Sequence, residues 1–301
     1  MDTFKIASTG VSMNYMPHYI AKERRFFAEL NMSIETIVPQ PWTDAVKAID
    51  EGTAHVVEGG MWVPMIYHNR VNEYKTFCQL SSRCPLVLVS REKVKHFDWR
   101  YLEEKTLLII GGDGASHGLF IQGCAIEAGV DMSKVKVINN FMASMLLELF
   151  LGGFGDVIAL QPDVALRLEK EGKGHILADM AKVGGDCPWS VYYSTPKILK
   201  ENLDLAGRFT KAIQKGTTEL LEKDASEFSD IIEKYWPQTD KQYAVDMINM
   251  FRENGMWQPV VKVDRTITDR WQKFLVYGNL LEKPIEDSYI IDDAPYKYTK
   301  K

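Results

Sequence analysis

Two stretches of this chain alternate short apolar strand candidates with helical segments, and this rhythm restricts the fold more than any other feature. In the first stretch, residues 4–8, 33–38 and 54–58 are strand candidates. Between them, residues 15–29 and 43–51 have helical periodicity. Strands that alternate with helices pair in parallel, and the helices cover the sheet. The order therefore predicts a β-α-β-α-β block near the start of the chain.

The same rhythm returns in the middle of the chain. Residues 106–110, 135–138 and 157–160 are strand candidates, with helical segments between them. A glycine-rich loop, residues 111–118, follows the first of these strands. It lacks the Lys-Ser/Thr ending of a P-loop, and its glycine spacing differs from the dinucleotide-binding pattern. The sequence thus predicts a second α/β block and does not favour nucleotide binding.

Two further strand candidates mark the places where the chain passes between the blocks. Residues 86–90 and 191–194 each follow a Cys-Pro or Cys-Pro-Trp step, and the last hundred residues are mostly helical. We therefore predict an α/β fold of two lobes, each with a mostly parallel sheet flanked by helices and with a ligand cleft between them. The first lobe is expected to comprise residues 1–88 plus 192–301, and the second residues 89–191.

Charge and hydropathy exclude two classes of partner. The chain of 301 residues has 36 Lys and Arg against 41 Asp and Glu, a formal net charge of −5, and no basic block. Nucleic acid is therefore not an expected partner. No stretch approaches the ~20 apolar residues that a membrane-spanning helix needs. The first residues have no basic segment followed by an apolar one, so no signal peptide is predicted within them.

The cysteines do not form a recognisable metal or redox motif. Cys78, Cys84, Cys124 and Cys187 include no C-x-x-C pair, and no histidine lies at zinc-finger spacing from them. We expect four small buried thiols, which fit a reducing compartment. The sequence predicts neither a metal site nor a cofactor.

Several segments resemble the bilobal periplasmic-type solute-binding proteins of type II. The resemblance is to the family that binds thiamine-pyrimidine precursors, riboflavin, sulfonates, taurine and nitrate. Residues 17–31 match its P-x-x-x-A-x-x-x-G-F-F-x-x-x-G-L pattern, with Arg25 and Asn31 in place of the two glycines. Residues 45–56 match A-x-x-x-L-x-x-G-x-x-D, with His55 at the acidic position. Residues 147–158 loosely repeat this second pattern, and residues 271–284 resemble the family's closing segment.

This resemblance implies a function in solute capture. It implies a monomer that holds a small, planar or heteroaromatic or acidic organic metabolite between its lobes and presents it to an ABC permease. The implied location is extracytoplasmic if a leader was trimmed before Met1, and cytoplasmic if Met1 is the native start. The ligand itself is not identified by the sequence.

The fold also predicts where a ligand would bind. In open α/β sheets, ligands lie beyond the carboxyl ends of the strands, near helix N-termini. Glycines beside Glu58 allow close approach of a ligand, and Trp62 and Trp189 offer flat surfaces for stacking. Alternatives remain: helix capping by Ser12 or Asn14, a surface ion pair for Glu58, and ordinary core packing for the aromatic residues. The predicted ligand-binding residues are Thr9, Ser12, Asn14, Tyr15, Glu58, Gly60, Met61, Trp62, Ser116, His117, Gln161 and Trp189.

An enzyme on the same fold is the alternative. The resemblance extends to a biphenyl sulfinate desulfinase, a pyrimidine-precursor synthase and menaquinone-pathway lyases. In the desulfinase a cysteine is catalytic, and Ser12 lies near its position here. If the chain is an enzyme, the catalytic candidates are His117, Glu58 and Cys187, with Glu58 as a general base and His117 polarising a carbonyl or leaving group.

Overall fold

The computed structural model describes residues 1–109 and 116–298, and it divides the chain into two compact units. The first unit consists of Met1–Ser82, Cys187–Gln272 and Lys283–Lys301. The second unit consists of Arg83–Asp186 and Lys273–Glu282. Both units are discontinuous in sequence, because the chain leaves each of them and returns.

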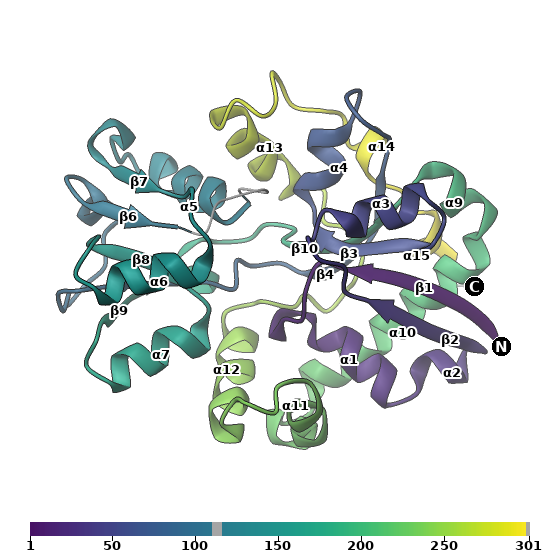
Figure 1. Ribbon diagram of the computed structural model, residues 1–301. Helices are drawn as coiled ribbons and strands as arrows, with labels where there is room; N and C mark the ends of the chain where they lie inside the picture. Colours follow the sequence, from purple (N-terminus) through teal and green to yellow (C-terminus); the bar gives the residue numbers. More distant parts are fainter. Residues whose placement is uncertain (110–115, 299–301) are drawn as a thin grey trace. The chain divides into compact units, whose positions relative to one another are not determined.

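The first unit contains a five-stranded sheet with the order β2-β1-β3-β10-β4 (Figure 1). β1 pairs in parallel with β2 and β3, whereas β10 is antiparallel to both β3 and β4. β3, β4 and β10 consist almost entirely of buried residues, which is expected of strands that are covered on both faces. The strands are β1 (Asp2–Ser8), β2 (Met32–Ile37), β3 (Val56–Gly60), β4 (Lys75–Ser81) and β10 (Ser190–Ser194).

Helices cover both faces of this first sheet. Figure 1 shows α1, α2 and α10 along one face and α3 and α4 along the other. α10 approaches α1 closely at Gly216, where a Cβ atom would collide with the carbonyl oxygen of Pro17. The helices of this layer are α1 (Met16–Glu23), α2 (Phe26–Glu29), α3 (Asp44–Asp50), α4 (Trp62–Tyr67) and α10 (Leu203–Glu222).

The carboxyl-terminal third of the chain adds further helices, and most of them belong to the first unit. α13 crosses from the first unit to the second between Gln272 and Lys273. The elements are α9 (Pro196–Glu201), α11 (Ser229–Tyr235), α12 (Lys241–Glu253), α13 (Thr268–Tyr277), α14 (Asp287–Ile290) and α15 (Ala294–Tyr298).

The second unit repeats the same arrangement with the strand order β7-β6-β8-β5-β9. Leu146 and Phe150 of α6 and Leu168 of α7 pack with strand residues such as Val89 and Ile158 in a core of hydrocarbon side chains. The strands are β5 (Val87–Ser90), β6 (Thr106–Leu108), β7 (Lys136–Ile138), β8 (Val157–Leu160) and β9 (His175–Asp179). The helices are α5 (Ser116–Glu127), α6 (Ala143–Leu151), α7 (Pro162–Lys170) and α8 (Met180–Val183).

The prediction of two α/β units with helix-flanked sheets is confirmed, but the boundaries between the units differ from those expected. The predicted boundary after residue 88 would cut β5, and the one after residue 191 would cut β10. In the structure β5 belongs wholly to the second unit and β10 wholly to the first, because each strand is hydrogen-bonded within one sheet. Lys273–Glu282 lies in the second unit rather than the first.

Local differences also have physical reasons. The predicted helix over residues 15–29 is interrupted at Arg25, whose backbone is left-handed with φ of 64°. β4 and β9, which the sequence analysis did not predict, mix polar and apolar residues without a clean period of two. Both lie at sheet edges and depend on an antiparallel partner from a distant part of the chain.

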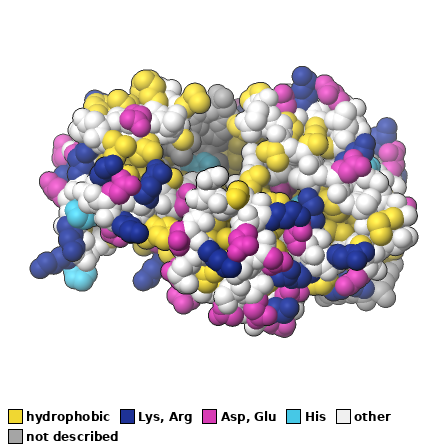
Figure 2. Space-filling view, turned by 60° about the horizontal axis from the view of Figure 1, so that its bottom comes forward, with side chains coloured by type: hydrophobic (Ala, Val, Ile, Leu, Met, Phe, Trp, Pro, Cys, Tyr) yellow, Lys and Arg dark blue, Asp and Glu magenta, His cyan; other side chains and the backbone are white. Residues whose placement is uncertain are grey.

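The surface is mixed in charge. Figure 2 shows basic and acidic side chains interspersed over the face that it presents, unlike the basic stripe typical of nucleic-acid-binding proteins. Within residues 1–109 and 116–298, no helix is both long and apolar enough to cross a bilayer.

Candidate ligand-binding site

One edge of the first sheet gathers polar residues from four strands. Ser8 at the end of β1 is opposite Glu58 of β3, and Gly60 at the end of β3 is opposite Ser190. Ser190 begins β10 and also pairs with Ser81, the last residue of β4. The carboxyl ends of β1, β3 and β4 therefore meet the amino end of β10 at one edge, where α/β sheets bind ligands.

The loop after β1 is fixed to β3 by backbone and hydroxyl contacts. The Thr9 amide donates to the Glu58 carbonyl oxygen at 3.0 Å, and the Thr9 hydroxyl donates to the same oxygen at 3.2 Å. The Thr9 hydroxyl also lies 3.2 Å from the Tyr15 hydroxyl. Ser8 Oγ donates to the Gly10 carbonyl oxygen at 2.8 Å. These contacts give the loop a defined shape directly above the end of β3.

Asn14 joins this loop to the other two strands. Its Nδ2 donates to Ser81 Oγ at 3.1 Å and to Ser190 Oγ at 2.9 Å. Its carbonyl oxygen accepts a hydrogen bond from Trp257 Nε1 at 2.9 Å, and its Oδ1 accepts one from Ser12 Oγ. Neither Ser12 nor Asn14 caps a helix through its side chain, so the capping alternative does not describe them.

Glu58 lies beneath the loop and is 1% exposed. Its Oε2 is hydrogen-bonded to Ser8 Oγ at 2.6 Å, and its Oε1 accepts from the Tyr192 hydroxyl at 2.6 Å. His18 Nδ1 lies 2.8 Å from the Tyr192 hydroxyl oxygen and 3.3 Å from Glu58 Oε1. Both carboxyl oxygens are thus engaged inside the protein, and the alternative of a surface ion pair for Glu58 is wrong.

Burial controls the ionisation of the groups around Glu58. Burial lowers the pKa of His18, and the nearby Glu58 only partly opposes this effect. Burial, followed by Glu58, raises the pKa of Tyr15 to about 12 and that of Tyr192 well above its usual range. The phenols are therefore protonated donors and the imidazole is neutral at neutral pH. Because Tyr192 donates to Glu58, its oxygen accepts from His18, which requires the Nδ1–H tautomer.

Tryptophan rings are concentrated near the same edge. Trp62 folds back over Gly60, where a Cβ atom would collide with the indole ring. Trp42 meets Trp62 edge to face, with ring centroids 5.4 Å apart. Trp189, the residue before Ser190 of β10, stacks on Trp271 at 5.9 Å. Trp62, Trp189 and Trp271 are 9%, 7% and 1% exposed, so most of each ring packs inside the protein, whereas Trp42 is half-buried.

The three remaining predicted residues, Ser116, His117 and Gln161, belong to the second unit. His117 lies in the first turn of α5 and is half-buried, and burial lowers its pKa to about 4. Gln161 is the exposed N-cap residue of α7 and makes no side-chain cap bond. α5 begins at Ser116, and residues 110–115, which include the first part of the predicted glycine-rich loop, lie outside the described residues.

The structure brings most of the predicted site residues of the first unit to one sheet edge, and it adds residues that were not predicted. Met61 lies beside them but is fully buried, and its sulfur accepts a hydrogen bond from Thr76 Oγ1 at 3.1 Å. No sequence pattern pointed to these added residues, because strand pairing and helix packing bring them to the site. The added residues are Ser8, His18, Ser81, Ser190, Tyr192 and Trp257.

Two of the three catalytic candidates, Glu58 and Cys187, are enclosed in the first unit. Glu58 has both oxygens engaged, and Cys187 is fully buried. Among the residues that the structure describes, no group of three or more His, Cys, Asp or Glu side chains could hold a metal ion.

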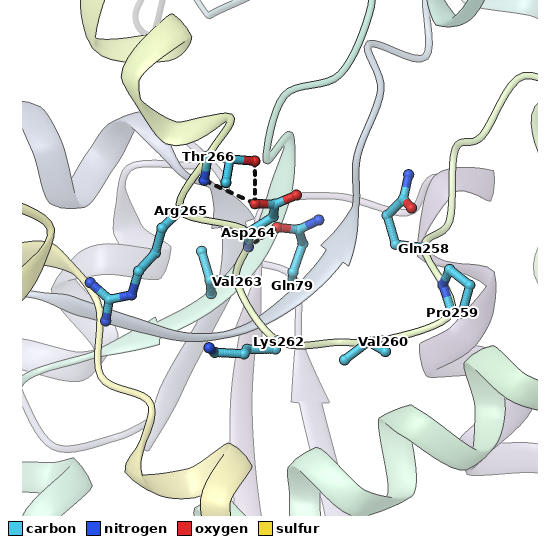
Figure 3. Close-up of a pocket in the computed structure, with 9 residues that line it drawn as sticks. All are labelled: Gln79, Gln258, Pro259, Val260, Lys262, Val263, Asp264, Arg265 and Thr266. Carbon is cyan, nitrogen blue, oxygen red and sulfur yellow. Dashed lines mark hydrogen bonds between the residues drawn. The ribbon is translucent and has the colours of Figure 1, made fainter.

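A separate pocket of about 430 Å³ lies along the loop of residues 258–266 (Figure 3). Gln79 at its base donates to Ser82 Oγ at 2.7 Å and accepts from the Asp264 amide at 3.1 Å. Asp264 in turn accepts from the amide and hydroxyl of Thr266, and Arg265 pairs with Asp293. The hydrogen bond between the Asp264 amide and Gln79 anchors this loop to β4.

Solved structures share this architecture over nearly their whole length. The ligand-binding component of an ABC-type import system from Staphylococcus aureus has a TM-score of 0.77 and 12% identity. The alignment covers 99% of this chain and 98% of that one. The periplasmic aliphatic sulphonate binding protein SsuA from Escherichia coli has a TM-score of 0.73 and 12% identity, over 98% and 99% of the two chains. The expected two-lobed type II fold of periplasmic binding proteins is thereby confirmed.

Sequence comparison then places the chain in a family. The family model described as NMT1/THI5 like matches residues 12–226, so the chain belongs to the NMT1/THI5-like family. It is also 26% identical to YtlA of Bacillus subtilis (strain 168), which is named as a candidate binding protein. That alignment spans 307 residues and covers 94% of this chain and 88% of YtlA. The family resemblance stated from the sequence is confirmed.

Proposed function

We propose that the chain is a solute-binding protein that captures a small organic molecule outside the cytoplasm and delivers it to the permease of an ABC importer. The observation that carries this proposal is the polar edge of the first sheet, where Thr9 and Asn14 are hydrogen-bonded to the ends of β3, β4 and β10 and the indole ring of Trp62 packs over Gly60 at the end of β3. Family membership and the names of the structural neighbours support the role in import and the extracytoplasmic location. A monomeric state stays a prediction.

The residue types at this edge favour a flat ligand that is neutral or cationic. Residues 8–15, 37–43, 58–64 and 187–190 form the loops and strand ends there and contain neither Lys nor Arg. Hydroxyl and amide groups provide neutral donors and acceptors, and tryptophan faces attract flat or cationic groups. An anion such as a sulfonate or nitrate would meet no side-chain cation in these segments. We therefore narrow the expected ligand to a planar, nitrogen-bearing molecule without a negative charge.

The first test is direct identification of a ligand. The purified protein is denatured, and released small molecules are identified by mass spectrometry. In parallel, a thermal-shift screen compares cytosine, adenine and nicotinamide with taurine, methanesulfonate and nitrate. A ligand at 100 times its Kd stabilises the folded state by about 2.7 kcal/mol, which raises Tm by several degrees. Stabilisation by the anions alone would contradict the charge argument.

A pair of tryptophan variants tests the location of the site. Trp62→Ala is expected to weaken binding of the identified ligand at least tenfold. Trp99 lies in the second unit, in the short 3-10 helix before β6, and Trp99→Ala is expected to bind as the unaltered protein does. Conversion of the ligand to a product during incubation would favour the enzyme alternative and overturn the transport role.

A further inference from the structure

We infer that Asn14 is a positioning residue that couples the loop of residues 9–15 to the two segments through which the chain passes between its units. Residues 81–83, where the chain leaves the first unit, and residues 186–190, where it returns, are the crossing segments. Asn14 is 2% exposed, so its side chain lies among protein groups instead of facing a ligand. The inference rests on the proposed function only in treating the loop as part of a ligand site.

The crossing segments are bonded to each other on either side of the passage. Within the first unit, the Cys187 amide donates to the Ser82 carbonyl oxygen at 2.9 Å. Within the second unit, Arg83 Nη2 lies 2.9 Å from Asp186 Oδ1 in an ion pair. The two segments therefore form one ribbon. Since the few residues where a chain passes between units absorb the backbone rotation of a hinge, a side chain that holds this ribbon can influence that rotation.

Asn14 holds both crossing segments at once. Its Nδ2 donates to Ser81 Oγ at 3.1 Å and to Ser190 Oγ at 2.9 Å. A side-chain amide nitrogen has two hydrogens, so both are used in these contacts. Ser81 is 0% and Ser190 is 3% exposed. Loss of the Asn14 donor would therefore take a hydrogen bond from two hydroxyl groups in the protein interior, which is costly.

The other polar atoms of Asn14 fix it within the loop. Ser12 Oγ donates to Asn14 Oδ1, and the Ser12 carbonyl oxygen accepts from the Tyr15 amide at 3.0 Å. The Asn14 carbonyl oxygen accepts from Trp257 Nε1 at 2.9 Å. A displacement of this turn would move the Asn14 amide away from the hydroxyl groups that it binds. The geometry thus provides a continuous path from Ser12, through one buried amide, to both crossing segments.

Amide hydrogen exchange of the full-length, unliganded protein tests the inference, read by mass spectrometry on peptides that contain residues 186–190. Asn14→Ala should raise the exchange of this segment about tenfold, because both crossing segments lose a donor. Ser190→Ala removes one of the two contacts and should raise the exchange about threefold. Ser194 is a matched control, because it lies at the other end of β10, is fully buried and donates to the His55 carbonyl oxygen at 2.5 Å. Ser194→Ala should leave the exchange of residues 186–190 within about twofold of the unaltered protein.

A substitution on the loop side of Asn14 tests the coupling itself. Ser12→Ala should raise the exchange of residues 186–190 about threefold, and it should add nothing in the Asn14→Ala background. No change in Ser12→Ala, or the same increase in both backgrounds, would overturn the inference. An equal rise of exchange in β1 and β2 of Asn14→Ala would also overturn it, since that pattern indicates general destabilisation of the first unit. These readouts need no ligand, so they stand or fall separately from the proposed function.

Discussion

The two sheets have the same strand order but different interiors. In each unit, three parallel strands are followed by an antiparallel strand that pairs with an edge strand: β10 with β4 in the first, and β5 with β9 in the second. The first sheet buries Glu58, His18 and Tyr192 in a hydrogen-bonded group. The hydrophobic core cluster around Phe150 in the second unit contains hydrocarbon side chains only.

This difference distinguishes the hydrophobic packing that stabilises the fold from the hydrogen bonds that fix the position of a loop. Among the described residues of the second unit, the buried polar side chain is Ser90, and the unit contains no counterpart of the Glu58, Tyr192 and His18 group, so the topology itself does not require such a group. Hydrophobic packing has little directional preference, whereas hydrogen bonds fix the positions of the atoms that make them. The first sheet therefore fixes the geometry of one loop by directional contacts.

The largest expected effect is a core truncation in the second unit. Phe150 is fully buried between α6 and the sheet, and Phe150→Ala should lower the free energy of unfolding by about 3–5 kcal/mol. The adjacent Leu151 is 38% exposed, and Leu151→Ala should cost less than about 0.5 kcal/mol. Denaturant unfolding measures both variants. Equal losses would mean that the hydrocarbon core does not carry the stability of this unit.

Two neighbouring tyrosines test the polar interior of the first unit. Tyr192→Phe removes the donor to Glu58 and should cost about 2 kcal/mol. Tyr193 is also fully buried, but its hydroxyl has no hydrogen-bond partner within the described part of the chain. Tyr193→Phe should therefore be neutral or slightly stabilising in the same denaturation experiment. If both substitutions cost the same, the hydrogen bonds around Glu58 do not contribute specifically.

Acid should weaken the second unit through His117. Burial lowers the pKa of His117 to about 4, whereas an unfolded histidine titrates near pH 6.5. The unfolded state thus takes up the proton first as the pH falls, and stability is lost between about pH 6.5 and 4. Because His117 is only half-buried, we expect a loss of about 1 kcal/mol at pH 5.

A variant that lacks only His117 separates this effect from that of His18. His117→Gln should flatten the dependence of the unfolding free energy on pH in this range, while the contribution of His18, whose pKa is also lowered, should persist. An unaltered pH profile in His117→Gln, measured by denaturation at pH 7, 6 and 5, would contradict the assignment.

The smallest expected effect concerns residues with a left-handed backbone, which follow α1 and α2 in the first unit and α5 in the second. In the second unit the left-handed residue after α5 is Gly129, with φ of 84°. In the first unit Arg25 and Asn31 adopt φ of 64° and 57°, at the positions where the family pattern has glycine. Arg25→Gly should relieve strain and raise stability by about 0.5 kcal/mol, and Asn31→Gly should change it less, because asparagine tolerates this conformation. A loss of stability in Arg25→Gly would show that its side chain contributes more than the strain costs.

Much of the fold was predictable, because hydrophobic periodicity and the glycine and proline residues that end helices and strands are local features of the sequence. The strand over residues 157–160 has the bounds that the sequence predicted. β4 and β9 were missed, because an edge strand with mixed polarity is defined by its partner and not by its own pattern. The split of the helix near Arg25 was also missed, since only the packed structure requires the left-handed residue.

The site was predictable to the same degree. Thr9, Asn14 and Trp62 follow strand ends, so the general rule for α/β sheets places them at the edge. Ser190 and Tyr192 were not predictable, because β10 is more than 120 residues from β3 in sequence and reaches it only when the chain returns to the first unit.

Glu58 illustrates the division between sequence and tertiary structure. The sequence by itself determined that two helix-flanked α/β units form, and that a carboxylate beside two glycines ends one strand. Only the tertiary structure decided that this carboxyl group is enclosed by Ser8, Tyr192 and His18. The reason is physical: strand formation depends on the pattern of neighbouring residues, whereas the partners of a buried polar atom depend on which distant segments share its surroundings.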